Sequence, residues 1–135
     1  MGTYMDQGET KFNIKAKNTQ RVVKAIKALH GQESIYDSSG SHFSWVDNKF
    51  YKLNTLQELM TAFRWEPTID ENGNIINVTF KGQKWGDDEQ FFEAIAPYVE
   101  TGSYIIMDIE GELHKWAFND GKFLSLVPKT TEEKK

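Results

Sequence analysis

A tight turn at Asn72 and Gly73 constrains the fold of this chain more than any other sequence feature. Asn-Gly is a strong short-range signal of a β-hairpin, because both residues tolerate the positive φ angles that the tightest hairpin turns require. Apolar and β-branched residues flank the turn at residues 67–69 and 75–81, and they predict the two strands. The chain is therefore expected to contain antiparallel β-structure.

The segments around this hairpin alternate between further hairpins and single helices. Strands are predicted at residues 10–17, 34–38, 41–47, 104–109, 113–119 and 123–127, with glycine-containing turns between neighbouring strands. Helices are predicted to begin near Thr19, after Thr55, where Glu58 completes a capping box, and after Asp87 or Asp88. The order β-α-ββ-α-ββ-α-βββ predicts an α+β fold, a mainly antiparallel sheet with three helices packed on it.

A length of 135 residues corresponds to one domain. We expect residues 1–9 to be frayed, residues 10–127 to form the domain and the charged residues 128–135 to be a disordered tail. The chain has no cysteine, which excludes disulfides and thiolate metal sites. The sequence shows no signal peptide and no apolar run that could span a bilayer, so we expect a cytoplasmic protein without a membrane partner.

The charges are unevenly distributed along the chain. Residues 1–65 carry nine lysines and arginines against six acids, a net charge of +3, whereas residues 66–135 carry seven against fourteen, a net charge of −7. If folding keeps the halves apart, an acidic face would repel nucleic acid and attract a partner with a basic surface. The alternative is an ordinary surface on which folding mixes the charges.

Acidic residues gather at two places in the second half. The first group lies at the predicted start of the third helix, next to a tryptophan: Trp85, Asp87, Asp88, Glu89 and Glu93. These carboxylates favour a helix N-terminus and could also hold Mg²⁺, and the capping role alone is sufficient to account for them. The second group lies around the predicted turn at Glu110 and Gly111: Asp108, Glu110 and Glu112.

No motif for catalysis, for a metal or for a cofactor is present. The loop at residues 82–86 lacks the Gly-Lys-Ser/Thr of a phosphate-binding loop. His114 lies two residues from Glu112, a pair that could act in acid–base chemistry, but a lone histidine in a strand is more often structural. The first helix has a basic face of Lys17, Arg21, Lys24 and Lys27. We interpret it as a solvated face, so direct nucleic-acid binding is not expected.

Several motifs together resemble a group of small proteins from phages, plasmids and conjugative elements of Gram-positive bacteria. The motifs are His-Phe-Ser-Trp-Val-Asp at residues 42–47, Phe-Arg-Trp-Glu-Pro at 63–67, Gly-Gln-Lys-Trp-Gly-Asp-Asp at 82–88, Ile-Ala-Pro-Tyr-Val at 95–99 and Gly-Ser-Tyr-Ile at 102–105. The resemblance covers residues 10–127 and carries no catalytic residues over. It implies a context in which small acidic proteins bind and block host defence systems, as anti-CRISPR and anti-restriction proteins do.

Three hypotheses about function follow. The first is a non-enzymatic binding protein from a mobile element, which uses the two acidic groups to inhibit a host protein that handles nucleic acid. The alternative is a small-ligand or nucleotide binder with a pocket lined by Arg64, Trp65 and Trp85. The third is a small hydrolase that uses His114.

Overall fold

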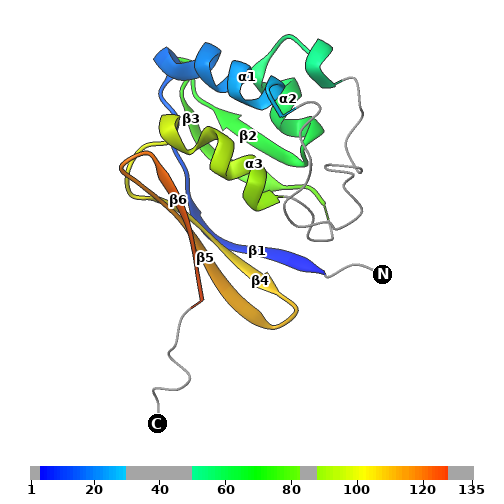
Figure 1. The fold of residues 1–135 in the computed structure, drawn as a ribbon, viewed down its shortest axis with the longest axis vertical. Coiled ribbons are helices and arrows are strands. Elements are labelled where there is room, and N and C mark those ends of the chain that lie inside the picture. Colours follow the sequence, from blue (N-terminus) through cyan, green and yellow to red (C-terminus); the bar gives the residue numbers. More distant parts are fainter. Residues whose placement is uncertain (1–3, 30–49, 83–87, 128–135) are drawn as a thin grey trace.

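The computed structural model describes residues 4–29, 50–82 and 88–127, and it confirms the α+β fold (Figure 1). The helices and strands, in chain order, are β1 (Met5–Lys11), α1 (Thr19–Lys27), α2 (Leu56–Ala62), β2 (Trp65–Ile69), β3 (Ile75–Phe80), α3 (Asp88–Ile95), β4 (Ser103–Ile109), β5 (Glu112–Asn119) and β6 (Lys122–Leu126). Short 3₁₀ turns occur at η1 (Ala16–Asn18), η2 (Phe50–Lys52) and η3 (Ala96–Tyr98). The strands predicted at residues 34–38 and 41–47, and the predicted tail at 128–135, lie outside the described residues.

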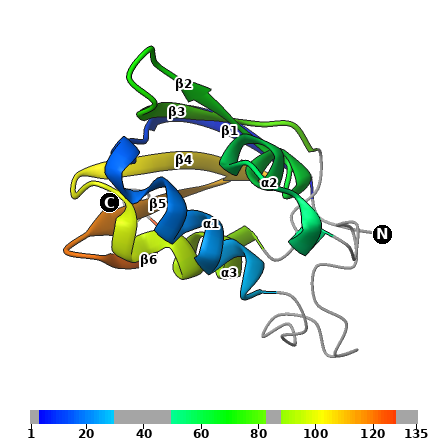
Figure 2. The same ribbon diagram turned by 90° about the horizontal axis from the view of Figure 1, so that it is seen from above.

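The strands form two antiparallel sheets that adjoin along β1. One sheet has four strands in the order β1-β4-β5-β6, and the other is the β2-β3 hairpin. Just beyond the end of β1, Ile14 exchanges backbone hydrogen bonds of 3.0 and 2.9 Å with Ile75 of β3. Viewed from above, the strands therefore follow one curved layer with the helices on its concave side (Figure 2).

The side chain of Gln7 makes the second link between the sheets. Its amide nitrogen donates to the carbonyl of Val78 at 2.9 Å, and its amide oxygen accepts from the backbone N–H of Phe80 at 2.8 Å. The register of β1 against β4 shifts between Gln7 and Thr10, which marks a bulge. The amide of Gln7 thus takes the place of a peptide group and satisfies two backbone groups of β3 that β1 does not reach directly.

Aromatic side chains fill the space between the helices and the sheet. Phe92 of α3 is fully buried and contacts Phe12, Trp65, Trp116 and Phe118 with ring centroids 4.9 to 5.8 Å apart. The rings meet at steep angles, the arrangement that aromatic quadrupoles favour. Residues from β1 through β5 belong to this single hydrophobic cluster. The described aromatic residues are thus mainly core residues.

The turn residues act as the sequence predicts. Gly73 adopts a φ of +86°, and the carboxylate of Asp70 accepts from the backbone N–H groups of Asn72 and Asn74 at 2.8 and 2.9 Å. In the turn between β4 and β5, Glu110 and Gly111 both have positive φ, and so do Asp120 and Gly121 between β5 and β6. Both are two-residue turns whose backbone twist matches that of the strands they join. The capping box is also present, because Glu58 and Thr55 each accept from the other's backbone N–H.

The expectation of a frayed N-terminus at residues 1–9 is wrong from Met5 onwards. Strand β1 begins at Met5, which is 1% exposed and pairs with Ile109, and the strand ends at Lys11 rather than at residue 17. The bulge after Gln7 interrupts the alternation of apolar and polar residues, and so it hides this strand in the sequence. Another difference is that the edge strand β2 begins at Trp65, two residues before the predicted start at Pro67, so that Pro67 lies within the strand opposite Val78.

Candidate functional site

The first predicted acidic group does not form an exposed surface. Asp88 is fully buried and Glu89 is 8% exposed, so neither carboxylate is available to a partner as the chain is folded. Glu93 of α3 is exposed. Trp85 and Asp87 lie outside the described residues. The first acidic group is therefore the weaker of the two candidates for a contact surface.

Asp88 accepts hydrogen bonds from two side chains of the segment that joins α2 to β2. The indole Nε1 of Trp65 donates to it at 2.9 Å, and a terminal guanidinium nitrogen of Arg64 lies 3.2 Å from its carboxylate. Arg64 has a φ of +74°, and its guanidinium lies over the ring of Phe80 at 5.3 Å. A Cβ at Gly82 would come within 2.9 Å of this guanidinium and 2.8 Å of the ring of Phe80, so a larger residue there would require these side chains to shift.

This arrangement also corrects the predicted ligand pocket. Trp65 is fully buried in the aromatic core, and Arg64 is paired with Asp88, so these two residues do not line an open pocket together. They fix the start of α3 to the start of β2. A fully buried carboxylate needs such partners, because an unpaired charge in the core costs several kcal/mol.

The second predicted acidic group is brought together at the turn between β4 and β5, and β1 adds a carboxylate that sequence reasoning missed. Asp6 lies directly opposite Asp108 in the pairing of β1 with β4. We call Asp6, Asp108, Glu110 and Glu112 the acidic tip. The sequence signal for Asp6 is the alternation of apolar and polar residues in β1. This alternation reaches Met5 only when it is followed back through the bulge after Gln7.

Several carboxylates of the acidic tip have local partners that fix their positions. Asp108 accepts from the backbone N–H of Gly111 at 2.7 Å, and Glu110 accepts from the backbone N–H of Tyr4 at 3.2 Å. Glu112 lies 3.3 Å from Nε2 of His114. No lysine or arginine in the described ranges forms an ion pair with the four carboxylates within 4.0 Å. Negative charge thus accumulates at this end of the sheet.

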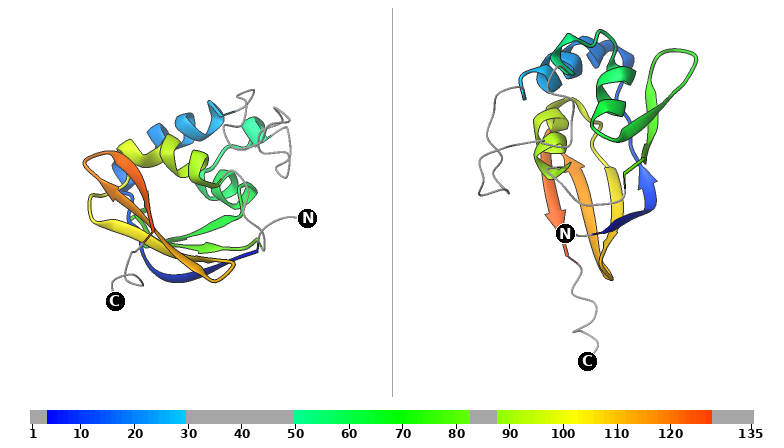
Figure 3. Two further views of the ribbon diagram at one scale, coloured as in Figure 1. Left: turned by 60° about the horizontal axis from the view of Figure 1, so that its bottom comes forward. Right: turned by 90° about the vertical axis from the view of Figure 1, so that its right-hand side faces the viewer.

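The outer face of the four-stranded sheet, which points away from the helices, adjoins the acidic tip (Figure 3). Cross-strand pairing arranges its side chains in three rows: Asp6, Asp108 and Leu113; then Ile106, Lys115 and Leu126; then Lys11, Tyr104, Ala117 and Leu124. Leu113 is 52% exposed, Leu124 48% and Leu126 46%. In the described part of the chain, no helix covers this face, so these leucines lie at the surface.

The third row is held by contacts around Tyr104. Its hydroxyl donates to Glu9 at 2.7 Å, and the ammonium of Lys115 lies 4.8 Å from the centre of its ring. The hydrogen bond to Glu9 raises the pKa of Tyr104 above its ordinary value of 10.0, because the neutral phenol is the donor. These contacts order the middle of the outer face.

Positive charge gathers at the other end of the molecule. Lys17, Arg21 and Lys24 are exposed on and just before α1, which lies at the opposite end of the long axis from the β4–β5 turn (Figure 1). A shallow cleft of about 510 Å³ is lined by Arg21, Lys24, Ala25, Ala28 and Tyr98. Among the described residues, the acidic tip and the basic face of α1 therefore lie at opposite ends of the long axis.

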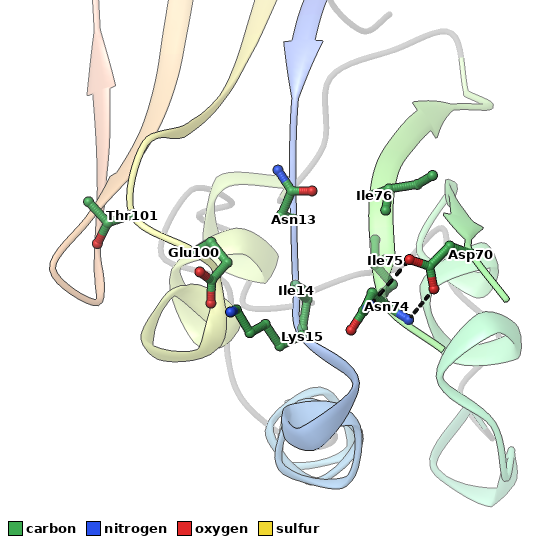
Figure 4. Close-up of a pocket in the computed structure, with 9 residues that line it drawn as sticks. All are labelled: Asn13, Ile14, Lys15, Asp70, Asn74, Ile75, Ile76, Glu100 and Thr101. Atoms are coloured by element: carbon green, nitrogen blue, oxygen red, sulfur yellow. Dashed lines mark hydrogen bonds between the residues drawn. The ribbon is translucent and has the colours of Figure 1, made fainter. Parts of the chain in front are cut away.

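A second cleft lies between the end of β1, the β2–β3 hairpin and the segment before β4 (Figure 4). It has a volume of about 430 Å³ and is lined by Asn13, Ile14, Lys15, Asp70, Asn74, Ile75, Ile76, Glu100 and Thr101. The side chains of Lys15 and Glu100 point toward each other across one side of it. Hydrogen bonds lower the pKa of Asp70, chiefly the one from the backbone N–H of Asn74. The lining of the cleft thus carries both positively and negatively charged side chains.

The structure offers no further support for a catalytic histidine. The imidazole of His114 contacts Glu112, as the sequence suggested, and its side chain is 13% exposed. Neither of the two clefts is lined by His114. Among the described residues, no group of three or more histidine or acidic side chains is placed to hold a metal ion.

Comparison with known proteins gives no match, whether to a protein-family model, to a curated protein or to a solved structure. Within the described ranges, no helix combines the length and the apolar character needed to cross a membrane.

Proposed function

We propose that this protein acts by binding another protein, without catalysis, and that the acidic tip and Leu113 form the contact surface. The observation that carries the proposal is the position of Leu113, which is 52% exposed and lies in one row with Asp6 and Asp108. Leu124 and Leu126 are also exposed on this face, and an exposed apolar patch with charged residues at its rim marks many protein interfaces. The partner that fits has a basic surface with an apolar contact for Leu113.

The two parts of the surface have different roles in binding. Carboxylates at the rim speed the encounter with a basic partner and set its orientation. Leu113 supplies apolar area that is removed from water in the complex, and this burial contributes to the affinity. The basic helix α1 lies at the far end, so it does not oppose an approach to the acidic tip.

A protein that handles nucleic acid is the partner class with the most suitable surface. Such a protein neutralises phosphates with lysine and arginine in its binding channel. An acidic domain that occupies the channel would compete with the nucleic acid. The proposal is therefore an inhibitor that acts by occupying a basic channel.

The test compares two variants with the same change in net charge. Asp6→Lys with Glu112→Lys reverses two charges of the acidic tip, and Glu71→Lys with Glu93→Lys reverses two exposed charges elsewhere. A protein captured by the tagged wild type from bacterial lysate is purified, and its affinity for all three forms is measured at low and at high salt. We expect the tip variant to bind at least about tenfold more weakly, because like charges then face each other.

The control variant should bind as the wild type does, and added DNA or RNA should displace the wild type from its partner. Equal affinities for the tip variant and the control variant would overturn the assignment of the surface. Binding that is unaffected by nucleic acid would overturn the assignment of the partner class.

A second candidate function is the binding of a small polar ligand in the 430 Å³ cleft. The volume falls in the range of ligand sites, and the lining carries the ammonium of Lys15 and the carboxylates of Asp70 and Glu100. A ligand with both charges, such as an amino acid, fits this lining. Thermal unfolding in the presence of amino acids and nucleotides tests it, with Lys15→Met as the variant expected to lose any stabilisation. A flat response across the panel would exclude this candidate.

A further inference from the structure

Strand β6 lies at the edge of the four-stranded sheet and has backbone groups that the sheet does not use. The two-residue turn at Asp120 and Gly121 makes Asn119 and Lys122 a hydrogen-bonded pair, and hydrogen-bonded pairs then alternate with non-bonded pairs along the hairpin. The N–H and C=O groups of Phe123 and Ser125 therefore point away from β5. Within the described ranges, no group hydrogen-bonds with this free edge.

This edge lacks the features that normally prevent two edge strands from pairing. Its sequence is Lys-Phe-Leu-Ser-Leu, with one charge at the first residue, no proline and no bulge. The edge strand of the other sheet differs, because β2 contains Pro67, which lacks an N–H, and it carries the charge of Glu66. Strand β6 is thus the less protected of the two edges.

We propose that β6 pairs antiparallel with β6 of a second copy of this chain, around a twofold axis at Ser125. In this register Ser125 lies opposite Ser125 of the second copy, and Phe123 lies opposite Val127. All the groups that face outward from β6 then meet outward-facing groups of the second copy. The pairing joins the two four-stranded sheets into one continuous antiparallel sheet.

The side chains support a second copy as the occupant of the edge. In the same register Leu124 lies opposite Leu126 of the second copy, so four leucines meet on the outer face. Leu124, Leu126 and Val127 are 48%, 46% and 45% exposed in the single chain. No charged residue occurs between Phe123 and Val127, so the paired segment brings no like charges together. The edge is therefore complementary to itself.

The inference rests on β6 alone and does not depend on the acidic tip. If the proposed contact surface and the proposed β6 pairing are both correct, the dimer has two acidic tips at the outer face of one sheet. The substitutions that test the partner surface leave β6 unchanged, and those that test β6 leave the acidic tip unchanged. Failure of one proposal is therefore distinguishable from failure of the other.

A single cysteine at the twofold axis tests the register. The natural chain has no cysteine, so Ser125→Cys can form a disulfide only between two chains. Directly opposed residues of a hydrogen-bonded antiparallel pair have Cα atoms about 5.5 Å apart, within the range that a disulfide spans. We expect mild oxidation to give a covalent dimer. Thr68→Cys, on the exposed part of β2, is the matched control and should cross-link far more slowly; equal rates would overturn the proposal.

A second variant tests the backbone pairing without a cross-link. Ser125→Pro removes an N–H that β5 does not use, so the β5–β6 hairpin is expected to persist, as circular dichroism and thermal unfolding would show. The wild type should sediment as a dimer, and the variant should dissociate at least about tenfold more readily because the central bonds are lost. A wild type that is monomeric at the highest attainable concentration, or a folded variant that dimerises equally well, would overturn the proposal.

Discussion

The buried position of Asp88 depends on the hydrogen-bond donors around its carboxylate. Its carboxylate is fully buried, and it accepts hydrogen bonds from the indole of Trp65 and the guanidinium of Arg64. The two donors lie at the junction of α2 and β2, whereas Asp88 begins α3. One carboxylate therefore joins two elements more than twenty residues apart.

Replacement of Asp88 by alanine should destabilise the protein by about 3 kcal/mol, because it leaves the charge of Arg64 and the N–H of Trp65 without this acceptor. Urea denaturation followed by tryptophan fluorescence measures the loss. Glu93→Ala, on the exposed face of the same helix, is the control and should change the free energy of unfolding by less than about 0.5 kcal/mol. Equal effects of the two substitutions would show that the buried contacts are not important for stability.

The sequence does not distinguish Asp88 from its neighbours. Four acids near the start of a helix have the same pattern whether they cap it, face solvent or form a buried pair. A partner that the local pattern does not reveal is Arg64, which lies 24 positions earlier and has a positive φ. Asp108, Glu110 and Glu112 were easier to place, because a two-residue turn brings them together locally.

At the scale of elements, local signals predicted turns and helix starts well, and pairing between distant segments poorly. The turns at Gly73, Gly111 and Gly121 and the capping box at Thr55 depend on a few adjacent residues. The pairing of β1 with β4 depends on residues about 100 positions apart. The local sign of strand β1 is its alternation of apolar and polar residues, and a bulge interrupts this alternation. Most turns and helices of the described residues were thus predictable, whereas the start of β1 and the joining of the sheets were not.

The link between the two sheets can be tested at Gln7. Gln7→Leu removes the donor to Val78 and the acceptor for Phe80 while keeping a side chain of similar size. We expect a loss of about 2 kcal/mol, because two partly buried backbone groups lose their partners. The amide of Phe80 should exchange faster with solvent deuterium, and amides of the β4–β5 hairpin should be less affected. Gln57→Leu, on the exposed face of α2, is the control.

At the scale of the whole molecule, β1 lies between β4, with which it pairs, and β3, to which it is linked by the side chain of Gln7 and by the bridge at Ile14. Removal of residues 1–9 would delete most of β1, expose two strand edges and remove the buried Met5. We therefore expect this truncation to abolish cooperative unfolding, as measured by circular dichroism during heating. Removal of residues 128–135 should preserve the transition. A cooperative transition close to that of the wild type in the first truncation would contradict the role assigned to β1.

The separation of charge is also a property of the whole molecule. The acidic tip combines a residue of β1 with residues at the β4–β5 turn, so its charge comes from segments about 100 positions apart in the sequence. The division into a basic first half and an acidic second half left two alternatives open, segregated charges or charges mixed by folding, and among the described residues the acidic tip and the exposed cations of α1 lie at opposite ends of the long axis. Asp6 belongs to the basic half of the sequence and yet contributes to the acidic end.

The central position of β1 has a consequence for how the chain is made. Strand β1 is synthesised before its partners, because it pairs with β4, whose last residue is Ile109, and the neighbouring Ile14 bridges to Ile75, the first residue of β3. Until those residues have been synthesised, Phe12 and Ile14 have no core to enter, although both are buried in the finished domain. Contacts between such distant residues make folding slow. The native sheet therefore forms only after Ile109 has been synthesised, and the segment that contains Phe12 and Ile14 must stay soluble until then.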